Sequence, residues 1–399
     1  DEYKEFYRKV FQDYKEPLFW IHLNMDYPFN LKGILYFPKV NLEYENIEGM
    51  IKLYNNQVFI ADNIKEVIPE FLLLLKGVID CPDLPLNVSR SALQNDGFVK
   101  KISDYITKKV ADKLSGMCKT DRENYEKYWD DISPFIKFGC LKDEKFKEKI
   151  KEYILFKDLQ DKYSTLSEYL ETLPEPEVEA EVVEPGEEDK EEPQETETPK
   201  KTVYYVTDLQ QQSQYINMFR EQEMNAVVLL HNIDQPFVSS LEAGDDAVKF
   251  QRIDADLTEA FKEEGDEEQL KEETELLTEI FKKATGRDNL EIKVEKLKND
   301  KVSSMITMSE DARRMQDMMK MYAANGMGGM GMSDMGQTLV LNANHALVQY
   351  VLEHKEEDNT DLICKQLYDL ALISHHPLEA DKMTEFIERS NEIMMLLEK

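Results

Sequence analysis

Residues 83–94 read Asp-Leu-Pro-Leu-Asn-Val-Ser-Arg-Ser-Ala-Leu-Gln and are the most informative stretch of this chain. Pro85 stiffens an extended run, and Ser89 is placed to cap the start of a helix. The apolar residues that follow have the spacing of one helix face, and they are Phe98, Ile102, Tyr105, Ile106 and Val110. The stretch therefore predicts an extended segment that turns into a long amphipathic helix.

Arg90 is unusual because it lies in the first turn of this predicted helix. A cation there faces the positive end of the helix dipole, which costs roughly 0.3–1 kcal/mol unless something compensates. Gln94 follows four residues later on the same face, and its amide can donate beside the guanidinium. Free backbone N–H groups at a helix start also favour an anion. The pair predicts a phosphate contact, and a surface arginine paired with a nearby carboxylate is the alternative.

Several long motifs carry a family resemblance. They are the run from Asn56 to Gln94, Glu5-Phe6-Tyr7-Arg8, Glu16-Pro17-Leu18 and Leu341-Asn342-Ala343-Asn344-His345. Together they resemble the ninety-kilodalton heat-shock chaperones, with the bacterial HtpG type fitting best. The likeness covers nearly the whole chain apart from an acidic insert. Nothing in the chain resembles the family's ATP-binding domain, so we expect a middle plus C-terminal fragment.

The resemblance implies roles for the phosphate-contact pair. In that family, the arginine and glutamine of this motif reach the γ-phosphate of ATP held by a separate N-terminal domain, and Arg90 and Gln94 match them by position. It also implies that ATP and Mg²⁺ act in the full-length parent and that this fragment alone binds neither. We therefore expect the fragment to be inactive as an ATPase by itself while supplying the arginine that contacts the γ-phosphate.

Composition narrows the class of protein further. The chain has 399 residues and a net charge of −32, which argues against nucleic acid and anionic membranes as main partners. Its four cysteines have no short pairing, which suits a reducing compartment. The longest apolar run, Phe71–Leu75, is far shorter than the ~20 residues of a membrane span. The chain opens without a signal peptide, so we expect a cytoplasmic protein, bacterial by resemblance. It also lacks an initiator methionine, which agrees with the expected fragment.

The pattern along the chain predicts two α/β units joined by helices, an α/β middle region, followed by an α+β C-terminal dimerisation domain. Strands are expected at Leu31–Phe37 and Ile51–Tyr54, a helix at Ile64–Leu75, and short helices separated near Pro134 and Gly139. The predicted boundaries are a large α/β unit at 1–115, a helical connector at 116–171, an acidic disordered linker at 172–200, a small α/β unit at 201–256 and the C-terminal domain at 257–399.

The small α/β unit and the C-terminal domain are predicted from separate strand and helix patterns. Strands near 203–207, 226–230 and 248–253, with helices between them, predict a small parallel sheet. Strands near 290–294 and 302–306 are expected in the C-terminal domain, which then closes with helices.

A methionine cluster begins at Thr307-Met308-Ser309-Glu310, whose spacing predicts a capping box and a helix from about residue 308. One stripe on that helix is formed by Met308, Ala312, Met315, Met319 and Tyr322, and Met318 and Met321 widen it. The stripe could be core, an adaptable binding surface of flexible thioethers, or a Cu(I) site. Methionine on more than one face favours the binding surface, and the resemblance implies that Met318, Met319, Met321 and Tyr322 contact client proteins.

The final helices carry two apolar stripes. The first contains Leu362, Ile363, Leu367, Leu370 and Ala371, and the second contains Met383, Phe386, Ile387, Met394 and Leu397. Such helices can complete their own domain. In the family they pair with a second protomer as a four-helix bundle, so the resemblance implies a homodimer through Leu367, Leu370, Phe386, Ile387 and Met394.

The sequence contains few signals of dinucleotide, nucleotide or metal binding. Gly326–Gly331 matches the dinucleotide-binding glycine pattern by letter, but it follows a predicted helix rather than a strand. The sequence contains no Walker A loop, and its histidines and cysteines have no metal-ligand spacing, so no metal site is predicted among them. We therefore expect an ATP-dependent clamp that binds non-native client proteins and assists their folding. A methionine-rich protein that binds Cu(I) is the alternative.

Overall fold

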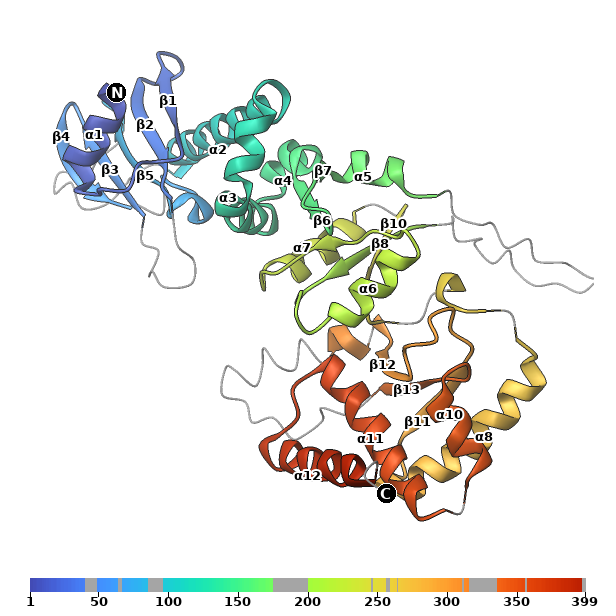
Figure 1. Ribbon diagram of the computed structural model, residues 1–399. Coiled ribbons are helices and arrows are strands. Elements are labelled where there is room, and N and C mark those ends of the chain that lie inside the picture. The colour runs from blue at the N-terminus through green and yellow to red at the C-terminus, as the bar shows by residue number, and fades with distance from the viewer. Residues whose placement is uncertain are drawn as a thin grey trace, which may run out of the picture. The chain divides into compact units, whose positions relative to one another are not determined.

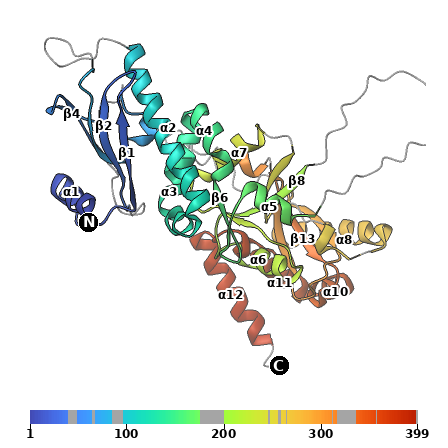
Figure 2. The same cartoon turned by 90° about the horizontal axis from the view of Figure 1, so that it is seen from above.

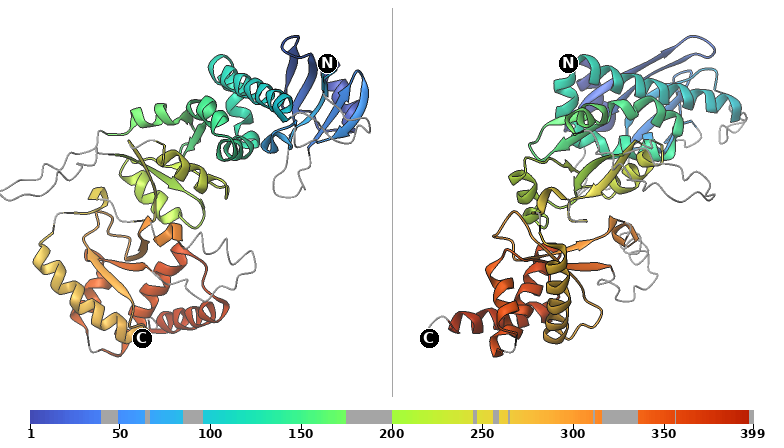
Figure 3. Two further views of the ribbon diagram at one scale, coloured as in Figure 1. Left: turned by 180° about the vertical axis from the view of Figure 1, so that it is seen from behind. Right: turned by 90° about the vertical axis from the view of Figure 1, so that its right-hand side faces the viewer.

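The computed structural model describes most of the chain, in the ranges 1–39, 49–63, 67–84, 96–174, 200–244, 247–255, 259–263, 265–310, 312–315, 336–355 and 357–396. Two compact units are present (Figures 1, 2 and 3). The first contains Asp1–Lys201 and His231–Val248, and the second contains Thr202–Leu230 and Lys249–Lys399. The acidic linker predicted at 172–200 lies almost wholly outside the described residues.

The first unit begins with a mixed sheet of strand order β1-β2-β5-β3-β4. Its strands are β1 Phe19–Met25, β2 Leu31–Phe37, β3 Met50–Asn55, β4 Val58–Asp62 and β5 Lys76–Asp80. Only β3 and β5 pair in parallel; the other neighbours are antiparallel. Helix α1, Glu2–Phe11, covers part of the sheet, where Tyr7 is fully buried with its ring 4.9 Å from that of Tyr36. The two strands predicted here, at Leu31–Phe37 and Ile51–Tyr54, are confirmed.

Helices and a hairpin complete the first unit. They are α2 Asp96–Thr120, α3 Arg122–Lys142, α4 Glu144–Ile150, the 3-10 turn η2 Lys151–Tyr153, the hairpin β6 Leu155–Asp158 and β7 Tyr163–Thr165, α5 Leu166–Thr172 and α7 Asp234–Glu242. The prediction of short helices separated near Pro134 and Gly139 is wrong, because α3 runs through both residues. A β-carbon at Gly139 would lie 2.7 Å from the Phe71 ring, so glycine there allows close packing.

The helix predicted at Ile64–Leu75 is also wrong over its described part. Residues 64–66 are outside the described ranges, and from residue 67 onward the only helical element before β5 is the 3-10 turn η1, Glu70–Leu72. The apolar side chains of the run are nevertheless buried, including Phe71, Leu72 and Leu75. A short apolar run has no unique period, and here tertiary burial favours a turn leading into β5.

The second unit opens with a small α/β layer. Strand β8, Lys201–Val206, lies between β10, Val248–Arg252, and β9, Val227–Val228, and pairs with β9 in parallel. Helix α6, Ser213–Glu221, lies between β8 and β9 in the chain. The 3-10 turn η3, Glu259–Phe261, then leads toward the C-terminal part. The three predicted strands of the small parallel unit are thus confirmed.

The C-terminal part contains a second sheet covered by helices. The strand order is β11-β13-β12, with β11 Glu291–Glu295, β13 Gln337–Asn342 and β12 Ser304–Met308. Strand β13 pairs in parallel with β11 and antiparallel with β12. Its helices are α8 Glu267–Thr285, α10 Ala346–Glu353, α11 Asp358–His375 and α12 Ala380–Leu396. Strands β11 and β12 were predicted, whereas β13 was not.

The core of the C-terminal part lies between this sheet and its helices. Leu277 and Phe281 of α8, Ile306 of β12, Leu341 of β13 and Leu367 of α11 are all buried in one apolar cluster. The fold is α/β in the middle region and α+β in the C-terminal region, as predicted. In the part of the chain that the structure describes, no helix is both long and apolar enough to span a membrane.

Candidate functional site

The predicted phosphate-contact residues, Arg90 and Gln94, lie outside the described residues, but the chain on both sides of them is firmly held. On the amino-terminal side, Leu84 is buried, and the Asn55 amide donates to three carbonyl oxygens in one turn. These are the carbonyls of Cys81 at 3.1 Å, Pro82 at 3.1 Å and Leu84 at 3.3 Å. The neighbouring Asp83 carboxylate accepts from the backbone N–H of Asn30 at 2.7 Å.

Helix α2 holds the carboxy-terminal side of the same segment. The predicted apolar face is confirmed, because Ile102, Ile106 and Val110 are buried. Tyr105 on this helix donates from its hydroxyl to the carbonyl oxygen of Asn24 in β1, at 2.9 Å. The structure therefore fixes both ends of the segment that contains Arg90 against the first sheet.

The predicted client-binding residues Met318, Met319, Met321 and Tyr322 also lie outside the described residues. The chain enters their segment from β12, whose residues are all buried, including Met308. The Ser309 hydroxyl accepts from the backbone N–H of Ala312 at 3.3 Å, so the helix begins at Glu310. The prediction of a helix from residue 308 is therefore wrong. Pairing with β13 extends the strand to Met308 and makes Ser309 the cap.

The helical residues 310 and 312–315, called here the Glu310 helix, end in an exposed methionine, Met315. Glu310 at the start of this helix is buried and accepts from three groups. They are the Tyr205 hydroxyl of β8 at 2.8 Å, the backbone N–H of Arg252 in β10 at 3.0 Å and Arg314 Nε at 3.1 Å. Charge-assisted hydrogen bonds of this kind are about twice as strong as neutral ones, so the helix is fixed to the α/β layer.

A second group of charges lies beside it around Asp254. The carboxylate of Asp254 lies 2.8 Å from Arg252 Nε and 3.1 Å from Arg313 Nη2. Arg313 also contacts His375, the last residue of α11, with 2.5 Å between Nη2 and Nε2. All four side chains are buried. Sequence reasoning assigned no role to this cluster, because its members are 2 to more than 100 positions apart.

The protonation states of the cluster follow from its charges. Burial lowers the pKa of His375 to about 3, and the nearby Arg313 cation acts in the same direction. The imidazole is therefore neutral, and its Nε2 accepts from Arg313. Burial alone would raise the pKa of Asp254, but Arg252 and Arg313 outweigh it and hold the pKa below its ordinary value. Asp254 is thus the ionised partner of two buried guanidinium groups.

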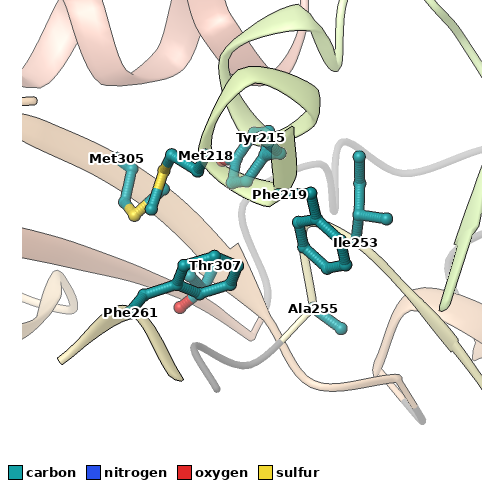
Figure 4. Close-up of a pocket in the computed structure, with 8 residues that line it drawn as sticks. All are labelled: Tyr215, Met218, Phe219, Ile253, Ala255, Phe261, Met305 and Thr307. Atoms are coloured by element: carbon teal, nitrogen blue, oxygen red, sulfur yellow. The ribbon is translucent and has the colours of Figure 1, made fainter. Parts of the chain in front are cut away.

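A small hollow lies in the same unit (Figure 4), and two of its lining residues, Ile253 and Ala255, flank Asp254 in the chain. It measures about 230 Å³, including space open to solvent. Its lining is Tyr215, Met218, Phe219, Ile253, Ala255, Phe261, Met305 and Thr307. None of these eight side chains carries a charge, and the Tyr215 hydroxyl already donates to the Ile306 carbonyl. The described lining of the hollow therefore offers no charged group for acid–base or phosphate chemistry.

The predicted dimer residues are described, and they divide into two kinds. Leu367 is buried in the core of its own chain, and Phe386 is half-buried. Leu370, Ile387 and Met394 are exposed, at 43%, 51% and 56% of their surface. Helix α12 is held to α11 by an ion pair from Arg389 to Asp369 and by a hydrogen bond from Gln366 to Ser390, and none of its residues is fully buried. Among the described residues, nothing covers the part of α12 that carries Ile387 and Met394.

The described residues give no support for a metal site. Within those ranges, no group of three or more histidine, cysteine, aspartate or glutamate side chains could hold a metal ion. The methionines considered for Cu(I) lie mostly in residues 316–335, outside the description.

Comparison with known proteins agrees with the motifs. The model of the Hsp90 protein family matches residues 1–179 and 193–398. A chaperone protein HtpG from Bacteroides thetaiotaomicron is 40% identical over 364 residues, which cover 89% of this chain and 50% of the relative. HtpG of Porphyromonas gingivalis is 39% identical over 90% of the chain, and that of Helicobacter acinonychis is 29% identical over 99%.

The relatives are molecular chaperones by name, and the α/β middle region with its α+β C-terminal region fits that class. The chain belongs to the Hsp90 family. It spans about half the length of the Bacteroides and Porphyromonas relatives that it matches.

Proposed function

We propose that this chain supplies the middle and C-terminal parts of an ATP-dependent chaperone, a dimeric clamp that binds non-native proteins in the cytoplasm. The observation that carries the proposal is the family match over nearly the whole chain, with 40% identity to a chaperone HtpG. The boundaries predicted at residues 115, 171, 200 and 256 belong to this proposal. The Cu(I) alternative has no observation in its favour.

Arg90 and Gln94 are proposed to contact the γ-phosphate of ATP bound by another domain of the same protein. ATP with Mg²⁺ would supply the phosphoryl chemistry there, and Arg90 would stabilise charge on the transferring group. The anchoring of the flanking chain by Asn55 and α2 supports this role, because an arginine of this kind must be held in a reproducible position. On its own, the present chain is not expected to hydrolyse ATP.

Met318, Met319, Met321 and Tyr322 are proposed to bind exposed apolar segments of client proteins. Thioethers are flexible and polarizable, so they can adapt to varied partners. The exposure of Met315, the last described residue before this segment, supports the assignment. The uncovered face of α12, with Ile387 and Met394, supports a second copy of the chain as the dimer partner.

The test is suppression of light scattering from a heat-unfolded model protein at near-equimolar ratio, without nucleotide. The wild-type chain should suppress scattering, and the variant M318S/M321S/Y322S should not. A matched control, Y14S/Y27S/M50S, removes two tyrosines and a methionine that are exposed elsewhere on the chain and should act like wild type. Equal suppression by both variants would remove client binding from residues 318–322. No suppression by the wild-type chain would contradict client binding by this chain alone.

A further inference from the structure

The buried charges around Asp254 join three elements of the second unit that are far apart in the sequence. Asp254 follows the end of β10, Arg313 lies on the Glu310 helix, and His375 ends α11. The Glu310 helix leads into the proposed client-binding segment, and α11 leads into α12, the proposed dimer helix. The Asp254 carboxylate therefore lies at the place where the α/β layer, the Glu310 helix and the end of α11 come together. The last two elements lead to the two proposed interfaces.

The side chains of Asp254, Arg313 and His375 contact one another in one continuous series. The Oδ2 atom of Asp254 lies 3.1 Å from Arg252 Nη2 and 3.1 Å from Arg313 Nη2. The same Nη2 atom of Arg313 contacts Nε2 of His375. The position of the Arg313 guanidinium is therefore set from both sides, by the α/β layer through Asp254 and by α11 through His375.

Electrostatics make Asp254 the residue on which the arrangement depends. Its carboxylate lies 2.8 Å from Arg252 Nε and 3.1 Å from Arg313 Nη2, and the buried His375 beside it is neutral. Removing its charge would leave two buried guanidinium groups with weakened compensation, which is far less favourable than removing both partners together. The neutral state of His375 keeps a third positive charge out of the cluster.

We propose that Asp254 is a positioning residue that couples the end of β10 to the Glu310 helix and to the end of α11, so that the client-binding and dimer segments keep one orientation. The coupling runs through Arg313. The part that concerns clients rests on the function proposed above, whereas the coupling between the three elements does not.

The buried pair of Lys137 and Asp234 in the first unit is the natural control. Its side chains are buried as deeply as those of the Asp254 cluster, with 2.5 Å between Nζ and Oδ1, but they join only α3 to α7. The variant D234N removes the same charge by the same isosteric change. Any effect that arises from a buried uncompensated cation alone should be similar in D254N and D234N.

The experiment is hydrogen–deuterium exchange on the full chain. In D254N, amide exchange should rise about tenfold or more in both 309–315 and 366–375, as expected when charge-assisted hydrogen bonds that close these segments are lost. In D234N, both segments should exchange as in wild type. An increase in only one segment, or an equal increase in both variants, would overturn the proposal.

A second variant keeps the proposal testable if D254N does not fold. H375L changes only α11 and leaves Asp254 paired with Arg313, so no buried charge loses its partner. Exchange should nevertheless rise in 309–315, on a different element, because Arg313 loses its contact with His375. Unchanged exchange in 309–315 would show that the end of α11 is not coupled to the Glu310 helix.

The light-scattering assay adds the functional part. If the wild-type chain suppresses scattering, D254N should need several-fold more chain for the same suppression, and D234N should not. If the wild-type chain does not suppress scattering, the proposed function fails while the exchange experiment still decides the coupling. Suppression by D254N equal to that of wild type, together with raised exchange, would overturn the role in client binding.

Discussion

The Nη2 atom of Arg313 lies 2.5 Å from the Nε2 atom of His375, and both side chains are only 3% exposed. A guanidinium is always charged, so this contact requires a neutral imidazole that accepts a hydrogen bond. The relationship links the helix that follows β12 to the end of α11, two elements separated by about 60 residues. It also makes stability depend on pH.

The first prediction concerns acid. The pKa of His375 falls from 6.5 to about 3 in the folded chain, so the unfolded chain binds this proton first as pH falls. The folded chain therefore keeps its full stability relative to the unfolded chain above pH 6.5, where His375 is neutral in both states. This stability is lost progressively between pH 6.5 and about 3. The loss should amount to about 5 kcal/mol in the free energy of unfolding. Chemical denaturation across this range should show a shallower pH dependence in H375Q; an unchanged slope would contradict the assignment.

The second prediction concerns the buried Lys137–Asp234 pair. K137M leaves the Asp234 carboxylate buried without its cation and should lower the free energy of unfolding by about 3–5 kcal/mol. The double variant K137M/D234N should recover part of that loss, because it removes the charge as well. K145M, at an exposed lysine of α4, should change stability by less than about 1 kcal/mol. Urea unfolding monitored by circular dichroism measures all three, and a K137M value near that of K145M would contradict the prediction.

The third prediction concerns Asn55. Its amide donates to three carbonyl groups just before the segment that contains Arg90, so N55A should cost about 1–3 kcal/mol. Hydrogen exchange should rise in residues 78–84, which form part of β5 and the turn after it. N24A, at an exposed asparagine on β1, is the control and should leave this peptide unchanged. Equal exchange in N55A and wild type would show that the turn is held by other contacts.

The fourth prediction concerns the dimer. I387E/M394E places two charges on the uncovered face of α12 and should reduce the light-scattering mass from twice the chain mass to once. L276E changes an exposed leucine on α8 and should leave the mass doubled. Deleting residues from 358 onward is less informative, because it would also remove Leu367 and Ala371 from the core. A doubled mass in I387E/M394E would place the interface elsewhere.

The fifth prediction concerns Arg90. We expect R90A to lower kcat for ATP hydrolysis by about 10²–10³-fold, as for removal of other groups that stabilise transition-state charge. The measurement uses a chimera in which this chain replaces the matching half of the Bacteroides thetaiotaomicron relative. K101A, which removes an exposed cation on α2, is the control and should keep kcat within a few-fold. An unchanged kcat in R90A would remove the arginine from the phosphate contact.

Local patterns predicted much of the fold. The apolar face of α2 and the strands β2, β3, β8, β10, β11 and β12 follow from periods of 3.6 and 2 residues, because such periods determine which face can be buried. Elements with weak or mixed patterns were missed or wrongly assigned. Strand β13 follows a glycine-rich stretch and was missed, and residues 67–75 form a turn although their apolar run suggested a helix.

The candidate site was accessible to sequence reasoning only in part. Motifs of several consecutive residues singled out Arg90, Gln94 and the methionine segment, and their roles stay predictions. The family match agrees with the family resemblance that the motifs carry. The start of the Glu310 helix was wrong by about two residues, because pairing between β12 and β13 extends the strand to Met308. Propensity along one segment cannot anticipate a strand partner about 30 residues away.

The amino-acid sequence by itself determined the family, the order of the main elements and the apolar stripes of α2, α11 and α12, since each of these is encoded in neighbouring residues. Only the tertiary structure decided that Leu367 faces the core while Leu370 and Ile387 stay exposed, and that Asp254, Arg313 and His375 meet. The physical reason is that burial and charge pairing depend on distances between segments. Those distances are set when the sheets and helices pack, and no local pattern contains them.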